Sequence, residues 1–160
     1  MEPWCRSNIT PQHLEGLVHR GLLRPLSVVE QWRLPGDEDE PSPPEGYVVS
    51  FALFHERGFA VPAHKFLWGL LEYYQVELQH LNPNGVLHIA AFVALCEGFL
   101  GISPHFDLWQ HFFAVSLSKK LVGKQALSTP IGCASIHLRN TRANDYPLMR
   151  LSTSNKGWHL

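Results

Sequence analysis

A series of apolar segments, several of which begin at a proline and end at a glycine, runs from Pro43 to Val115. Proline suits the first turn of a helix, because its missing N–H would have no partner there. Glycine suits the stop, because it enters the left-handed conformation without a Cβ clash. This pattern predicts a mainly α fold, a compact bundle of about five helices, and it carries no catalytic chemistry.

The composition is that of one folded domain with a sizeable core. The chain has 160 residues, of which 45% are hydrophobic and 17% are charged, which is unlike a disordered chain. The formal net charge is −1 with its ten histidines neutral. No global field therefore draws the protein to nucleic acid or to an anionic membrane.

The cysteines and the N-terminus indicate an intracellular, soluble protein. Cys5, Cys96 and Cys133 form no CxxC pair, which argues against a disulfide framework or a zinc knuckle and favours a reducing compartment. The opening residues MEPWCRSN lack the apolar stretch of a signal peptide. The longest unbroken apolar run, Ile89 to Cys96, is far shorter than the roughly 20 residues of a membrane span, so we expect no membrane partner.

We divide the chain into four parts of one domain. Residues 1–33 form an N-terminal helix and connection, 34–46 an acidic proline-rich linker, 47–115 the helical core, and 116–160 a basic turn and a C-terminal β element. The linker cannot bury apolar area, so we expect a solvated tether. The segment from Tyr47 to Arg57 fits either a strand or a helix, and the glycine at 58 favours the helix.

The centre of the core is expected to be a helix from Pro83 to Leu100. Asn82 precedes Pro83 as a good N-cap, and the helix is apolar nearly all round, which is typical of a helix at the middle of a bundle. We expect its buried residues to be Val86, Leu87, Ala90, Ala94, Leu95 and Phe99.

Two neighbouring helices are predicted to flank this one. The first begins at Pro62 and carries Trp68 on its polar face, so Trp68 is our candidate for an exposed interaction residue. The second follows Ser103-Pro104 and presents an aromatic face formed by Phe106, Trp109, Phe112 and Phe113.

The C-terminal third alternates between apolar and polar residues in two runs. These runs are Cys133–Arg139 and Leu148–Thr153, joined by turn-forming residues, and together they predict a small C-terminal β-hairpin. An isolated two-stranded ribbon is marginal in water, so we expect it to be less protected than the helical core.

Several ordered blocks resemble one known family, the plant "putative gypsy-type transposon" domain. The resemblance runs from about His13 to His159, and its blocks are PPEGYVVSFALFHERGF, VPAHKFLWGLLEYYQVEL, LNPNGVLHIAAFVALCEGFLGI, HFDLWQHFFAV, GCASIHLR and LSTSNKGWH. It implies a transposon origin and a nuclear or retroelement context, but no catalytic residue. Family members usually continue past GWH, so the resemblance also implies that this chain is truncated.

Candidate sites for metal or acid–base chemistry are weak. His105, Asp107 and His111 lie on one predicted helix, but two imidazoles six residues apart need a further ligand from elsewhere to hold an ion. His88 is either a buried base or, as we prefer, a core histidine bonded to a carbonyl. No serine lies in a GxSxG turn and no glycine-rich phosphate loop is present. We predict no catalytic residue, no cofactor, no metal and no small-molecule substrate.

The function that follows is a non-enzymatic interaction or assembly module of transposon origin. A gag-like structural role fits, with a protein partner or self-association. The alternative is a nucleic-acid-binding module that uses the basic residues of the C-terminal third, which are Lys119, Lys120, Lys124, Arg139, Arg142 and Arg150. The third hypothesis is an active transposase or nuclease. It ranks last because the convergent carboxylates of a two-metal site are not evident.

Overall fold

The computed structural model describes residues 4, 6–25, 32–34, 36–117, 120–122, 126–128 and 131–139, and of residues 120–122 and 126–128 it describes the backbone alone. The helices are α1 (Pro11–His19), α2 (Ala52–Glu56), α3 (Lys65–Tyr74), the 3-10 turn η1 (Leu78–His80), α4 (Pro83–Ala94), the π-helical η2 (Leu95–Leu100) and α5 (Phe106–Phe112). The strands are β1 (Phe113–Leu117), β2 (Lys120–Val122), β3 (Ala126–Ser128) and β4 (Ala134–Leu138). The described residues are thus mainly α with a small antiparallel β element, as predicted.

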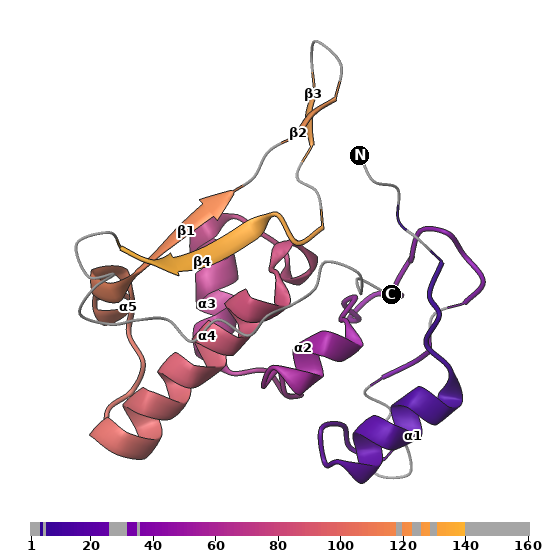
Figure 1. The fold of residues 1–160 in the computed structure, drawn as a ribbon, viewed down its shortest axis with the longest axis horizontal. Helices are drawn as coiled ribbons and strands as arrows, with labels where there is room; N and C mark the ends of the chain where they lie inside the picture. The colour runs from indigo at the N-terminus through magenta and orange to yellow at the C-terminus, as the bar shows by residue number, and fades with distance from the viewer. Residues whose placement is uncertain are drawn as a thin grey trace.

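Helix α4 is central, and it begins where its cap predicts. The Asn82 side-chain oxygen accepts a hydrogen bond from the Gly85 amide at 2.6 Å, and Pro83 occupies the first turn. The helix contacts α2 on one side and β4 on another (Figure 1). Its approach to α2 is close: a Cβ added at Gly58, whose φ is +94°, would lie 2.8 Å from the Cβ of Ala90.

The core is built around aromatic rings from α3, α4 and α5. Trp109 is fully buried. Its ring centroid lies 5.2 Å from that of Phe92, 5.8 Å from that of Phe66 and 4.3 Å from that of Phe113. Edge-to-face and stacked contacts of this kind add to the free energy gained by burial. They hold α3, α4 and α5 together at the end of the molecule where β1 begins.

The strand that pairs with β4 was not predicted. We expected Phe113 to continue the last helix, but α5 ends at Phe112, and Phe113 begins β1. Strands β1 and β4 lie side by side (Figure 1). Their register is antiparallel, with Val115 opposite Ile136, and the Arg139 amide donates to the Phe112 carbonyl at 2.9 Å. A strand forms here because β4 supplies partners for the backbone groups of residues 113–117.

The alternating run at the C-terminus is confirmed as a strand in its first half. Ala134, Ile136 and Leu138 are buried against α4, as their alternation predicts. A second antiparallel pair, β2 with β3, lies between β1 and β4 in the chain. The run Leu148–Thr153, which we expected to pair with β4, lies outside the described residues.

Two predicted helix starts differ from the structure. Helix α3 begins at Lys65 rather than Pro62, because the His64 Nδ1 accepts a hydrogen bond from the Phe66 amide at 3.1 Å and so caps the helix there. In the ambiguous segment 47–57, the helix covers Ala52–Glu56 alone, and residues 47–51 precede it without regular structure.

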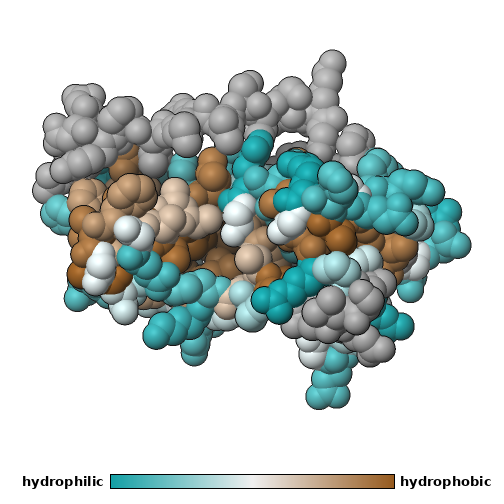
Figure 2. Space-filling view, turned by 90° about the horizontal axis from the view of Figure 1, so that it is seen from below, coloured by the Kyte–Doolittle hydropathy of each residue, from teal (hydrophilic) through white to brown (hydrophobic). Residues whose placement is uncertain are grey.

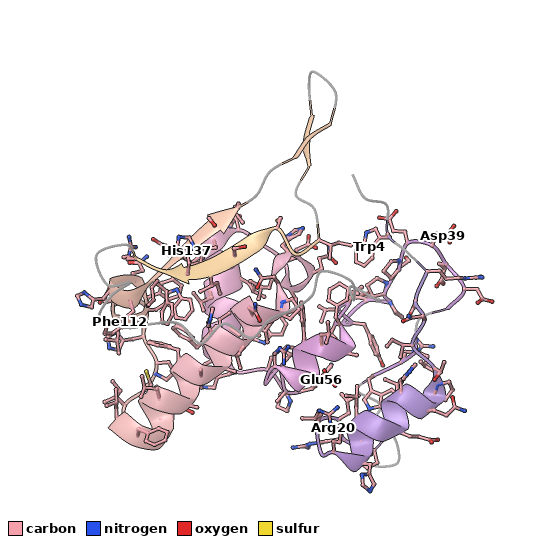
Figure 3. All side chains as sticks on the ribbon, viewed as in Figure 1. Trp4, Arg20, Asp39, Glu56, Phe112 and His137 are labelled. Atoms are coloured by element: carbon pink, nitrogen blue, oxygen red, sulfur yellow. The ribbon has the colours of Figure 1, made fainter. Side chains whose placement is uncertain are left out.

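The N-terminal part of the chain packs against α2. The Trp4 ring stacks on that of Phe51, with centroids 6.4 Å apart. Arg20, just after α1, places a guanidinium nitrogen 2.7 Å from a carboxylate oxygen of Glu56 at the end of α2 (Figure 3). These contacts bring α1 alongside the helical core.

Candidate interaction surface

The second half of the central helix, with the residues just after it, exposes large apolar side chains. Leu95 is 49% exposed, Phe99 84%, Leu100 55% and Ile102 41%. We call these four residues the distal apolar surface. Figure 2 shows apolar surface at the left end of the molecule, where the end of α4 and η2 lies in Figure 1.

This exposure corrects a prediction. Of the six residues expected in the core, Val86 is buried, while Leu87 and Ala90 are half-buried. The other three, Ala94, Leu95 and Phe99, are exposed. The reason is length: α4 and η2 together span Pro83–Leu100, and the elements packed on them cover the first turns more fully than the last.

One face of η2 nevertheless points inward. Cys96 is fully buried, and the Ile102 amide donates to its carbonyl at 3.0 Å as the chain leaves the helix through Gly101, whose φ is +66°. Burial raises the pKa of the Cys96 thiol, and the neighbouring charge of Glu97 raises it further. The thiol is therefore protonated at neutral pH and behaves as a small apolar side chain.

The distal apolar surface carries no charge of its own. Glu97 is the one Asp, Glu, Lys or Arg between Pro83 and Leu100. Its carboxylate lies 3.1 Å from the Nε2 of His64, at the start of α3. The charge is therefore held toward a neighbouring helix.

The same helix meets a length and composition criterion for crossing a membrane. Among the described residues this holds for Pro83–Leu100, of which 39% is buried. Core helices meet the same criterion, and the buried residues Val86, Ile89 and Phe92 lie in its first half. The finding is weak evidence for a membrane span, because the first half of the helix lies in the core of the fold.

The three metal-site candidates do not form a metal-binding group. His105 is the N-cap of α5, where its Nδ1 accepts from the Leu108 amide at 3.4 Å. Asp107 lies in the first turn of α5, and the His111 ring contacts that of Phe112. Within the described part of the chain, no three His, Cys, Asp or Glu side chains are grouped to hold an ion.

Most residues of the predicted basic cluster lie outside the part of the chain that the structure describes. Arg139 follows β4, is exposed, and donates a side-chain hydrogen bond to the Gln110 carbonyl. Lys120 begins β2, whose side chains are not described. The remaining four, Lys119, Lys124, Arg142 and Arg150, lie outside the described residues. The nucleic-acid surface therefore stays a prediction.

Two further candidates lie where the sequence places them. Trp68 is 41% exposed on α3, so it is available for contact, and its role in binding stays a prediction. His88 is a buried residue of α4 whose ring stacks on that of Phe113, with an angle of 26° between the planes and centroids 6.3 Å apart. This packing is that of a core residue.

The middle of the chain matches a known protein family. Residues 48–117 match the family described as "Putative gypsy type transposon". This confirms the resemblance to a gypsy-type transposon family over these residues. The chain matches no curated protein and no solved structure. The gypsy-type segment runs from just before α2 to the end of β1, and it contains the whole distal apolar surface.

Sequence reasoning missed one polar pair in the gypsy-type segment. The Ser50 hydroxyl lies 3.1 Å from the Nε2 of His55, which is on α2 and 6% exposed. Burial lowers the pKa of His55, and the Phe59 main chain opposes this more weakly. A serine and a histidine five residues apart in an ambiguous segment gave no signal that could have identified the pair.

Proposed function

We propose that this protein is a non-enzymatic assembly module of transposon origin, in which two copies associate through the distal apolar surface. One observation carries the proposal: four large apolar side chains, 41% to 84% exposed, lie within eight residues of one another in η2 and just after it. The match to a gypsy-type transposon family supports the origin. A structural role in a mobile element fits a helical domain, but the argument rests on the surface itself.

Exposure on this scale favours a partner. Monomeric proteins rarely leave contiguous apolar patches larger than a few hundred Å² in water. Each Å² removed from water contributes about 25 cal/mol. Because Phe99 is 84% exposed, covering its side chain with a partner would contribute favourable free energy that the isolated chain does not obtain.

The chemistry of the surface favours a second copy of the same chain. With Glu97 held by His64, two such surfaces can face each other without opposing like charges. Exposed small residues, Ala94 and Gly98, lie beside the large Leu95 and Phe99. A Cβ added at Gly98 would meet no atom within 4 Å, so there is room beside this residue. Large side chains of one copy can thus fill the space over small ones of the other, as a two-fold symmetric interface requires.

The cysteines support an intracellular setting for this module. Cys96 and Cys133 are free and buried, and burial raises the pKa of both thiols. Free thiols of this kind suit a reducing compartment.

The test is the oligomeric state of the whole chain across a concentration series, measured by sedimentation velocity after nuclease treatment. We expect a reversible monomer–dimer equilibrium, and Phe99→Ser should shift it to monomer. Val48→Ser is the matched control: Val48 is 58% exposed but lies outside the distal apolar surface, so this variant should dimerise like the wild type.

Two results would overturn the proposal. One is a wild-type protein that stays monomeric at the highest concentration reached. The other is binding to uncharged phosphatidylcholine vesicles that Phe99→Ser abolishes while the sedimentation of the wild type in their absence is monomeric, since that result would assign the surface to a membrane.

A further inference from the structure

A groove lies between the N-terminal part of the chain and the helical core, on residues that the proposed assembly does not use. Its volume is about 900 Å³. Leu14 and Leu17 of α1 form part of one wall, Trp32 and Tyr47 lie along the connection, and Trp68 of α3 lines the core side. This volume is within the range of about 300–1,000 Å³ that is typical of small-molecule sites.

Three contacts join segments of the chain that adjoin the groove. Arg20 bridges to Glu56 at 2.7 Å, which ties the end of α1 to the end of α2 (Figure 3). The Trp32 indole N–H donates to the Arg24 carbonyl at 2.8 Å. Arg6 pairs with Asp37 at 3.2 Å. These contacts join the segments on either side of the groove without a ligand, and such preorganisation lowers the cost of binding.

Ser50 and His55 place a neutral polar pair on the groove wall. The Ser50 Oγ lies 3.1 Å from the His55 Nε2 and is on an exposed residue, so the hydroxyl can reach both the imidazole and a ligand. Because burial lowers the pKa of His55, the ring is uncharged at neutral pH.

The remaining charges along the groove balance. Among the described residues that line it, Arg33 is the one strongly basic and Glu38 the one acidic residue, and the Arg33 guanidinium lies over the Tyr47 ring, 5.9 Å from its centroid. The rest of the lining is dominated by aliphatic and aromatic side chains and prolines. A charged ligand would incur the free-energy cost of leaving water without gaining an opposite charge in such a site. For an uncharged apolar ligand this cost is small.

We propose that this groove binds an uncharged, mainly apolar small molecule whose single hydrogen-bonding group meets the Ser50–His55 pair. The aromatic side chains of Trp32, Tyr47 and Trp68 supply flat apolar contacts, and the hydroxyl fixes the orientation of the ligand. This inference goes beyond the sequence, which predicted no small-molecule substrate, and it is independent of the proposed dimer because none of the four distal residues lines the groove.

Two dyes with the same aromatic rings test the proposal. N-phenyl-naphthylamine is uncharged and has one N–H, and anilinonaphthalene sulfonate adds an anionic group to the same framework. Titrated into the whole chain and followed by fluorescence, the uncharged dye should bind saturably at one site per chain and several-fold more tightly than the anionic dye. Ser50→Ala should weaken its binding by about fivefold, as loss of one neutral hydrogen bond does.

Trp68→Ala should weaken the binding of the uncharged dye more than Ser50→Ala does, because the Trp68 substitution removes an aromatic side chain from the groove wall. Both residues are exposed, so circular dichroism should show both variants folded. Phe99→Ser is the control and should leave the affinity unchanged. Equal affinity for the two dyes, or unchanged affinity in both groove variants, would overturn the inference. Loss of binding in Phe99→Ser would also overturn it, because that result would place the dye on the distal apolar surface.

Discussion

The Glu97 carboxylate lies 3.1 Å from the Nε2 of His64, while the Nδ1 of the same imidazole accepts the Phe66 amide. One histidine thus caps α3 and holds the acidic side chain of η2. With Nδ1 as the acceptor, Nε2 carries the proton that is donated to Glu97. As a consequence, η2 presents an apolar surface while its one acidic side chain, Glu97, is bound by His64 at the start of α3.

Core and distal positions of the central helix should respond differently to truncation. Ile89→Ala, at a buried site, should cost about 2–5 kcal/mol of unfolding free energy, as emptied core positions do. Leu95→Ala should cost less than about 1 kcal/mol, because Leu95 is 49% exposed. Urea unfolding, measured at a protein concentration below the dimerisation range, separates the two. Equal losses would mean that Leu95 is covered in the monomer.

Reversing the charge at Glu97 should affect assembly more than folding. Glu97→Lys breaks the contact with His64 and leaves a cation on each copy beside the distal apolar surface. Exposed ion pairs contribute about 0–1 kcal/mol, so the unfolding free energy should change little, while the dimer should weaken. Sedimentation velocity and urea unfolding measure the two effects. Glu97→Gln, which keeps a hydrogen-bond acceptor for His64, is the control and should dimerise.

His55 should make the folded state sensitive to mild acid. Burial lowers its pKa below the ordinary value of 6.5, so the unfolded chain binds a proton at a pH where the folded chain does not. The contribution of His55 is therefore fully present above about pH 6.5 and declines as the pH falls from there toward the folded pKa. We expect the unfolding free energy of His55→Gln to fall less than that of the wild type over this window. Parallel pH profiles would contradict the assignment.

Hydrogen exchange should show strong protection in β4. The side chains of Ala134, Ile136 and Leu138 are buried against α4, and β4 is paired with β1. We therefore expect its amides to exchange about as slowly as those of Val86–Phe92, although the sequence pattern alone predicted a weakly protected hairpin. The amides of η2 should exchange faster in the monomer than in the dimer. Fast exchange throughout β4 would mean that the β1–β4 pair opens independently of the helices.

The helical class and several element boundaries were determined by local sequence. Asn82 and Pro83 satisfy and preset the first turn of α4, and glycine at 101 lets the chain leave η2, whatever surrounds them. The alternation of Ala134, Ile136 and Leu138 likewise predicts which face of β4 is buried. These features depend on backbone conformation and side-chain period, which neighbouring residues in the chain control.

Tertiary structure decided which apolar residues are covered and which polar ones meet. Phe113 is compatible with a helix or a strand, and pairing with β4 selects the strand. Leu95 and Phe99 have the apolar character of core residues, yet they are exposed because the elements packed on α4 do not extend that far. Ser50 and His55 come together through the turn into α2 and the burial of the imidazole. Such outcomes depend on the lengths and positions of distant elements, and no local pattern records them.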